Sequence, residues 1–200
     1  MAEKNKPLVV DFVGGAVGHR FRQGGGRSQA LPKAIGFKAG IIPNVVDATA
    51  GLGRDAFLLA SLGATVTMVE RNEDMYQHLL DGMERARKEN DEYRDIMDRL
   101  TLIHGDAKEI IPTLNPEIIL VDPMHPERKK SALVKKEMRI IRDLVGTDPD
   151  AKELMEVALH HASKRVVLKW PMKADPIEDL RKPSHQITGK TTRYDVFIRS

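Results

Sequence analysis

A glycine-rich turn between an apolar run and a helix constrains this chain more than any other feature. Residues 45–56 read Val-Val-Asp-Ala-Thr-Ala-Gly-Leu-Gly-Arg-Asp-Ala, so Asp47 ends the apolar run and Gly51 and Gly53 form the turn. Glycine has no Cβ, which lets the backbone approach a ligand closely. The helix that follows begins with unpaired N–H groups. In α/β proteins, such a turn after the first strand binds the nucleoside part of a cofactor.

Apolar runs and helical segments alternate along most of the chain. We expect parallel strands at residues 45–48, 65–69, 102–104, 118–121 and 165–168. We expect helices at residues 54–61, 72–97, 131–145 and 151–162. Strands that alternate with helices form a parallel sheet covered on both faces. The last two runs, 185–188 and 194–198, flank Gly189-Lys190 and predict an antiparallel hairpin. The predicted fold class is therefore α/β, a Rossmann-like, seven-stranded, mostly parallel sheet with an antiparallel last strand, as in class I methyltransferases.

The N-terminal part of the chain does not follow this rhythm. Residues 6–12 predict a short strand, and glycines at 14–15 and 24–26 interrupt the pattern around a basic hairpin or loop. Ser28 is a candidate N-cap for a short helix over residues 28–35. These features predict a short basic extension before the main sheet.

The composition is that of an ordinary globular chain. Its 200 residues are 41% hydrophobic and 30% charged, which is enough for one domain with a core. We expect residues 43–200 to form a single domain, with residues 1–42 as a glycine-rich basic extension packed on it. The chain has no cysteine, which excludes disulfides and thiolate metal sites. Without an apolar leader or membrane span, we expect a protein of the cytoplasm with no membrane partner. We also expect no metal, and the sequence leaves the oligomeric state open, with a monomer slightly favoured.

Positive charge is concentrated in two segments, although the net charge is only +3. Residues 19–38 carry five basic residues and no acid, and residues 127–142 carry seven basic and two acidic residues. Such polarity indicates either a polyanionic partner or a solvated helix face, with about equal weight. If the partner is a folded RNA, these side chains are candidates to bind its phosphates. The predicted RNA-binding residues are Arg20, Arg22, Arg27, Arg128, Lys129, Lys130, Lys135, Lys136 and Arg139.

Acidic residues follow the expected strands at the positions that a methionine-type cofactor requires. Asp47 can meet an ammonium group, whereas a dinucleotide pyrophosphate would be repelled there. Arg54 and Asp55, at the helix start, suit the same amino-acid end. Glu70 ends the second strand, where an acid can accept both ribose hydroxyls. Asp106 follows the third strand, either as an adenine contact or as the N-cap of the next helix.

The segment Asp122-Pro123-Met124-His125-Pro126 follows the fourth strand and selects the class of reaction. It is a variant of the Asp/Asn-Pro-Pro-aromatic signature of enzymes that methylate exocyclic amino groups of bases. Such an amine is a poor nucleophile because its lone pair is delocalised into the ring. The Asp122 carboxylate and the Pro123 carbonyl can hold its two N–H groups and aim the lone pair at a methyl donor. His125 would stack on the extruded base.

Two other functions fit parts of this pattern. The spacing Gly51-x-Gly53-x-x-Ala56 also satisfies the dinucleotide fingerprint, so an NAD-dependent oxidoreductase is one alternative. A non-catalytic RNA-binding or ribosome-assembly module that retains the fold is the other.

Several segments together resemble one known family, the ribosomal RNA small subunit methyltransferase J family. They are residues 11–15, 24–27, 45–57, 70–72, 102–104 and 131–139, and the similarity extends from about residue 8 to residue 198. The resemblance implies transfer of a methyl group from S-adenosylmethionine to the N2 amino group of one guanosine in 16S ribosomal RNA. It implies cofactor contacts at Arg54, Asp55, Glu70, Arg71, Asp106, Ala107 and Asp122, of which Arg71 and Ala107 rest on the resemblance alone. Members tend to carry phenylalanine at the position of His125 and an additional N-terminal region.

Overall fold

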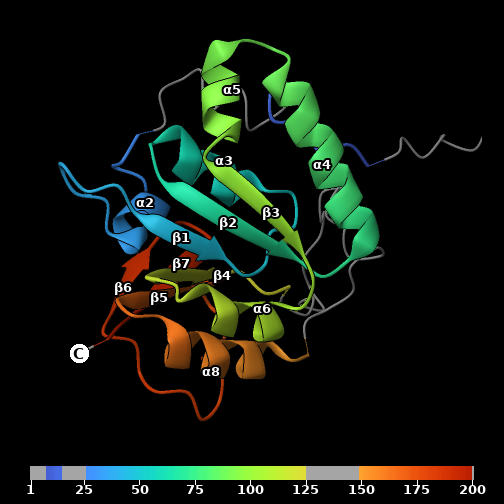
Figure 1. Cartoon of the computed structure of the whole chain (residues 1–200). Coiled ribbons are helices and arrows are strands. Elements are labelled where there is room, and N and C mark those ends of the chain that lie inside the picture. The colour runs from blue at the N-terminus through green and yellow to red at the C-terminus, as the bar shows by residue number, and fades with distance from the viewer. Residues whose placement is uncertain (1–7, 15–25, 125–148, 200) are drawn as a thin grey trace, which may run out of the picture.

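A single mixed sheet organises the chain in the computed structural model, which describes residues 8–14, 26–124 and 149–199 (Figure 1). Its strands are β1 (Asn44–Asp47), β2 (Thr65–Glu70), β3 (Leu100–His104), β4 (Ile118–Val121), β5 (Arg165–Pro171), β6 (His185–Thr188) and β7 (Thr192–Ile198). In the described part of the chain, they form a seven-stranded sheet in the order β3-β2-β1-β4-β5-β7-β6. The first five are parallel, and β7 pairs antiparallel with both β5 and β6. This topology confirms the predicted Rossmann-like fold.

Helices cover both faces of the sheet (Figure 1). One face carries α2 (Ala30–Ile35), α3 (Arg54–Ser61), α4 (Glu73–Arg87) and α5 (Asp91–Met97). The opposite face carries α6 (Ala107–Leu114) and α8 (Ala151–His161). Alternate strand residues point to the two faces. Leu120 therefore packs in the core under α2 to α5, and Ile119 packs in the core under α6 and α8. None of the helices described is long and apolar enough to cross a membrane.

The strand order places the acids predicted from the sequence at one edge. Strand β1 pairs with β2 on one side and with β4 on the other, so the chain reverses direction across the sheet at β1. In open α/β sheets, ligands bind outside the carboxyl ends of the strands at such a switch point. Asp47 and Glu70 end β1 and β2, and Asp122 directly follows β4.

The strand predicted for residues 6–12 is wrong in its described part, because residues 8–14 belong to no strand. Val10 and Phe12 are nevertheless buried, and the Phe12 ring stacks on Phe57 with centroids 5.4 Å apart. The Val10 carbonyl accepts a hydrogen bond of 2.9 Å from the Arg85 guanidinium rather than from a neighbouring strand. The segment therefore packs over α3 and α4 without joining the sheet.

The single helix predicted for residues 72–97 is divided into α4 and α5. The division lies at Asn90, whose side chain accepts the N–H of Tyr93 at 3.0 Å and starts α5. Gly82, which weakens the helical pattern, lies inside α4, where a Cβ would come within 2.8 Å of Val10. Ser28 is not the cap of α2: the N-cap position is Gln29, which makes no capping side-chain bond. The helix predicted for residues 131–145 lies outside the described residues.

Candidate active site

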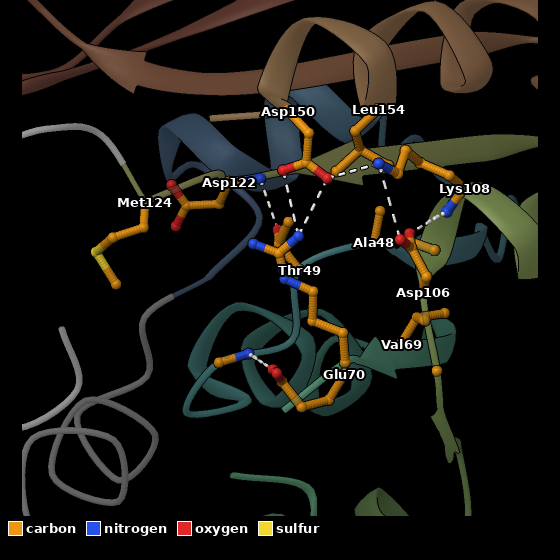
Figure 2. A pocket seen from close by; sticks show the side chains of 14 residues that line it. Ala48, Thr49, Val69, Glu70, Asp106, Lys108, Asp122, Met124, Asp150 and Leu154 are labelled. Carbon is orange, nitrogen blue, oxygen red and sulfur yellow. Dashed lines mark hydrogen bonds and ion pairs between the residues drawn. The ribbon is translucent and has the colours of Figure 1, made fainter. Parts of the chain in front are cut away.

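A pocket opens at the carboxyl edge of the sheet, where β1, β2, β3 and β4 end. It contains about 610 Å³ of space between atoms, a volume that includes open solvent. Figure 2 shows Asp122 and Met124 on one side of it, Asp106 and Lys108 on the other, and Glu70 and Asp150 between them. The residues that line it are Ala48, Thr49, Gly51, Val69, Glu70, Arg71, Gly105, Asp106, Ala107, Lys108, Asp122, Met124, Asp150 and Leu154.

Glu70 connects the end of β2 to the turn after β1. Its side chain is buried, and one carboxylate oxygen accepts the backbone N–H of Gly51 at 2.9 Å. The other oxygen accepts the N–H of Asn72 at 2.9 Å. These bonds fix the carboxylate in the wall of the pocket. A fixed carboxylate at this position can accept hydrogen bonds from a ligand's hydroxyl groups.

Asp106 has the capping role that the sequence left as one of two options. Its side chain accepts the N–H of Lys108 at 2.9 Å and begins α6, whose first residue is Ala107. Both Asp106 and Ala107 also line the pocket. The observed cap therefore does not exclude a contact with a ligand.

Asp122 lies at the other side of the pocket, immediately after β4. Its backbone N–H donates to the Thr49 hydroxyl at 2.7 Å, which ties the end of β4 to the turn after β1. Its carboxylate is about two-fifths exposed, at 39%. The acid is therefore accessible at the rim of the pocket. Pro123 and Met124 follow, and His125 lies outside the described residues.

Lys169, near the end of β5, joins two of the predicted acids. Its Nζ lies 2.6 Å from Asp55 Oδ2 and 2.7 Å from Asp122 Oδ2. Burial alone would lower the pKa of Lys169, but the Asp122 and Asp55 carboxylates raise it above the usual value. The lysine is therefore an ammonium ion at neutral pH. The sequence analysis did not identify it, although a polar residue at the carboxyl end of the fifth strand was a usable signal.

Asp47 is the most buried of these acids, with 2% of its surface exposed. Its pKa is raised to about 7, first by burial and then by the negative charge of Asp55, against a hydrogen bond from the Thr49 N–H that lowers it. A buried carboxyl group of this kind becomes an anion most readily when a cation is placed beside it. Asp47 itself is not in the pocket lining.

A second ionic network, which the sequence analysis also missed, crosses the opposite wall. Asp150, at the start of α8, accepts hydrogen bonds from Arg71 at 3.1 Å and from Lys108 at 2.7 Å. The pKa of Asp150 is lowered, first by the Lys108 hydrogen bond. The only sequence signal for this network was the position of Asp150 directly before the helix predicted for residues 151–162. This network holds Arg71 against α8, in the wall of the pocket.

The structure brings six of the ten predicted cofactor residues into the lining of one pocket: Gly51, Glu70, Arg71, Asp106, Ala107 and Asp122. The other four are Asp47, Gly53, Arg54 and Asp55. Arg54 and Asp55 begin α3. Asp55 pairs with Lys169, which in turn pairs with Asp122 in the pocket lining. Gly53 has a φ of 66° and is buried, and a Cβ on it would lie 2.9 Å from Leu79. Packing and backbone conformation therefore require glycine at this position.

The predicted RNA contacts lie almost entirely beyond the part of the chain that the structure describes. Arg27 is the exception: it is exposed, and its guanidinium lies 5.8 Å from the centre of the Phe37 ring. The predicted contacts outside the described residues are Arg20, Arg22, Arg128, Lys129, Lys130, Lys135, Lys136 and Arg139.

The donor set of the site fits S-adenosylmethionine. Asp47, Asp55 and Asp122 supply three carboxyl groups against the one ammonium of Lys169, which suits a ligand with a sulfonium and an ammonium group. The same acids would repel a pyrophosphate. Glu70 supplies the fixed acceptor that a ribose requires. Within the described ranges, no group of three or more His, Cys, Asp or Glu side chains could hold a metal ion.

Comparisons with known proteins agree with this geometry. A family model described as "Putative SAM-dependent methyltransferase" matches residues 1–199. The chain is 63% identical over 198 residues to ribosomal RNA small subunit methyltransferase J of Agrobacterium fabrum, an alignment that covers 99% of this chain and 95% of the relative. The chain belongs to the ribosomal RNA small subunit methyltransferase J family. It is also 63% identical over 193 residues to the Brucella anthropi protein of the same name, covering 96% of this chain and 94% of that one.

A solved member of this fold gives the same result in three dimensions. The SAM-dependent methyltransferase from Neisseria gonorrhoeae superposes with a TM-score of 0.76 at 38% identity, covering 98% of this chain and 76% of that one. The family assignment confirms the predicted enzyme class and the predicted cofactor, S-adenosylmethionine. An NAD-dependent oxidoreductase and a non-catalytic assembly module are not favoured.

Proposed function

We propose that this protein transfers a methyl group from S-adenosylmethionine to the N2 amino group of a guanosine in small-subunit ribosomal RNA. The observation that carries the proposal is that Glu70 and Asp122 line one pocket. The first is the acid expected to hold the ribose of the donor, and the second is the acid expected to hold the acceptor amine. Both reactants would therefore meet at the carboxyl edge of the sheet.

The residues of this edge divide into contacts to different parts of the cofactor. We assign Glu70 to the ribose hydroxyls and Asp106 with Ala107 to the adenine. We assign Asp47, Arg54 and Asp55 to the methionine end, where Asp47 faces the ammonium and Arg54 the carboxylate. Gly51 and Gly53 shape the turn between these two groups, and Arg71 closes the wall near Asp150.

The proposed reaction depends on orientation rather than on a strong base. Bound S-adenosylmethionine supplies an electrophilic methyl group on its sulfonium. The Asp122 carboxylate and the Pro123 carbonyl accept the two N–H groups of the target amine and aim its lone pair at that methyl. A nitrogen–carbon bond forms as the carbon–sulfur bond breaks with its electrons on sulfur, and one N–H proton passes to Asp122 or water. His125 stacks on the base that has left its helix.

The nature of the substrate is supported by the family and by charge. The relatives from Agrobacterium fabrum and Brucella anthropi are named for small-subunit ribosomal RNA. Segments 19–38 and 127–142, with their excess of basic residues, would bind its phosphates. We propose the cytoplasm, where ribosomal subunits are assembled, as the site of action and a monomer as the active form.

We also propose that residues 1–42 form an extension that packs on a methyltransferase domain of residues 43–200. Buried residues of the first range support this division, because Val10, Phe12 and Leu31 share a hydrophobic cluster with α3 and the sheet.

Methyl transfer to small ribosomal subunits tests the proposed function. Purified protein is incubated with radiolabelled S-adenosylmethionine and subunits from cells that lack the endogenous activity, and the modified nucleotide is mapped by nuclease digestion and mass spectrometry. We expect one N2-methylguanosine in 16S ribosomal RNA. Label at another position, or on another base, would contradict the substrate assignment.

Asp122→Ala provides the matched test of the catalytic assignment. Removing the acceptor for the amine should abolish transfer, by a factor of about 100 or more, while RNA association remains nearly unchanged. Normal turnover by this variant would refute the role of Asp122. Calorimetric titration with S-adenosylmethionine and with NAD gives the control for the alternative enzyme class, since only the first should bind.

A further inference from the structure

We propose that Lys169 is a positioning residue for methyl transfer, which holds the Asp122 carboxylate in place for the acceptor amine. The inference rests on the proposed function and adds a residue that the family resemblance does not supply. It is carried by a three-residue arrangement: Lys169 lies between Asp55, at the start of α3, and Asp122, after β4.

The sheet register puts Lys169 beside Asp122. The last described pair between β4 and β5 is Val121 with Leu168, so Asp122 and Lys169 are the next residue on each strand. Neighbouring parallel strands lie about 4.8 Å apart, which a lysine and an aspartate can bridge directly. Lys169 Nζ reaches Asp122 Oδ2 at 2.7 Å and Asp55 Oδ2 at 2.6 Å. The bridge therefore joins β5, β4 and the first turn of α3.

The charges of the cluster show what this bridge prevents. Three carboxyl groups, Asp47, Asp55 and Asp122, interact here, and Asp55 and Asp122 both raise the pKa of Asp47. Lys169 is the cation that opposes this effect on Asp47. Without it, the Asp55 and Asp122 carboxylates would repel each other in a partly buried site. The Asp122 side chain would then turn away from the position in which it accepts the amine.

The exposure of the three side chains separates Lys169 from an ordinary surface ion pair. Asp55 and Lys169 are each 24% exposed, while Asp122 is 39% exposed and lines the pocket. Lys169 contacts the Asp122 carboxylate but is not itself among the residues that line the pocket. Lys169 acts through Asp122, so it is a positioning residue and not a catalytic one.

Lys169→Met and Lys169→Arg test the inference, because methionine removes the charge at similar length and arginine retains it. We expect Lys169→Met to lower kcat for small subunits about 10- to 100-fold while the Kd for S-adenosylmethionine changes less than about threefold. The acidic limb of its pH–rate profile should move to higher pH, since Asp122 loses its cation. Lys169→Arg should restore the wild-type pH profile and part of kcat.

Lys164→Met is the matched control. Lys164 directly precedes β5 and pairs with Glu117 at 2.8 Å, and neither of these two residues lines the pocket. It should leave kcat, Kd and the pH profile unchanged. Thermal unfolding of each variant checks that the fold is retained. If Lys169→Met does not fold, Lys169→Gln, which also removes the charge but keeps a polar side chain, decides: a lower kcat with an unchanged Kd supports the inference, and wild-type kinetics overturn it.

The outcomes separate this inference from the proposed function. An active wild type with an equally active Lys169→Met variant, or one with an unshifted pH profile, overturns the role of Lys169 alone. A loss confined to the Kd would make Lys169 a ligand of the cofactor and would also overturn the inference. Wild-type protein that transfers no methyl to small subunits would overturn the proposed function, and this inference with it.

Discussion

The carboxylate of Glu70 accepts the backbone N–H of Gly51 at 2.9 Å, so the end of β2 fixes the turn that follows β1. The same carboxylate accepts the N–H of Asn72, the N-cap residue of α4. One side chain therefore sets the position of a cofactor-binding turn and of the helix behind it. A residue with both roles should affect ligand binding and stability together.

Glu70→Gln should weaken both the binding of S-adenosylmethionine and the stability of the fold. Glutamine keeps one acceptor oxygen, but its NH₂ group would face a backbone N–H that has lost its partner. Hydrogen bonds to a charged group are worth about 1.5–3 kcal/mol, so the Kd for S-adenosylmethionine should rise about 10- to 100-fold. Calorimetry and thermal unfolding measure the two effects. Glu84→Gln, which makes the same charge change at an exposed position of α4, should alter neither.

Gly53→Ala should destabilise the fold more than it disturbs the cofactor. The residue has a φ of 66°, and its Cβ would lie 2.9 Å from Leu79 Cδ2 and 3.0 Å from Phe12 Cζ. Left-handed backbone costs about 1–2 kcal/mol for alanine, and overpacking adds about 1–3 kcal/mol. We expect a loss of Tm of about 5–15 °C in thermal unfolding.

Gly40→Ala separates the two contributions to that loss. Gly40 has a φ of 75°, but nothing lies within 4 Å of its Cβ position. It should therefore lose only the backbone part, about 1–2 kcal/mol. Equal losses at the two glycines would show that the contacts of Gly53 with Leu79 and Phe12 do not matter.

Asp47→Asn should stabilise the ligand-free protein at neutral and alkaline pH. The folded-state pKa of about 7 lies above 3.8, the usual value for aspartate, so between these values the folded protein holds a proton that the unfolded chain has released. Stability due to this group therefore falls as pH rises from about 4 to 7. Asparagine has no proton to lose, so its Tm should exceed that of the wild type by at least about 2–4 °C at pH 7.5.

The advantage of Asp47→Asn should shrink as the pH is lowered toward 4.5, where the wild-type carboxyl is protonated. Thermal unfolding in matched buffers without S-adenosylmethionine measures the difference. A gap that is the same at both pH values would contradict the burial argument for Asp47. Asp95→Asn, at an exposed position of α5, is the control for the change in net charge.

The sequence was sufficient to predict the sheet and the acids at its edge. Buried parallel strands appear as short apolar runs, and the residue after each run lies at the ligand-binding edge once the strands are parallel. Glu70 and Asp122 could be placed in this way, and the structure brings both into one pocket. Their positions depend on local sequence and one topological rule, not on long-range detail.

Long-range ion pairs could not be predicted in the same way. Lys169 is 114 residues from Asp55 and 47 residues from Asp122, and nothing in the local pattern pairs them. The contacts of Asp150 with Arg71 and Lys108 are of the same kind. The strand prediction for residues 6–12 was wrong for another reason. Apolar residues at alternate positions, as at Val10 and Phe12, suit packing on helices as well as pairing in a sheet.

Asp106 offers a test of the two roles that the sequence left open. As an N-cap it bonds the Lys108 N–H at 2.9 Å, and as a pocket residue it is within the region assigned to adenine. Asp106→Ala removes both functions, so it should lose about 1 kcal/mol of stability, or about 2–4 °C in Tm, and also bind S-adenosylmethionine more weakly. Asp106→Ser keeps a capping oxygen but shortens the side chain.

We expect Asp106→Ser to retain the wild-type Tm within about 2 °C, because serine is as good an N-cap as aspartate, and still to bind S-adenosylmethionine about tenfold more weakly. The combination follows from geometry: a cap needs an acceptor only at the first turn of α6, whereas an adenine contact needs a carboxylate that extends into the pocket. If Asp106→Ser binds the cofactor like the wild type while Asp106→Ala does not, the carboxylate acts only by holding the start of α6, and its proposed contact with adenine is wrong.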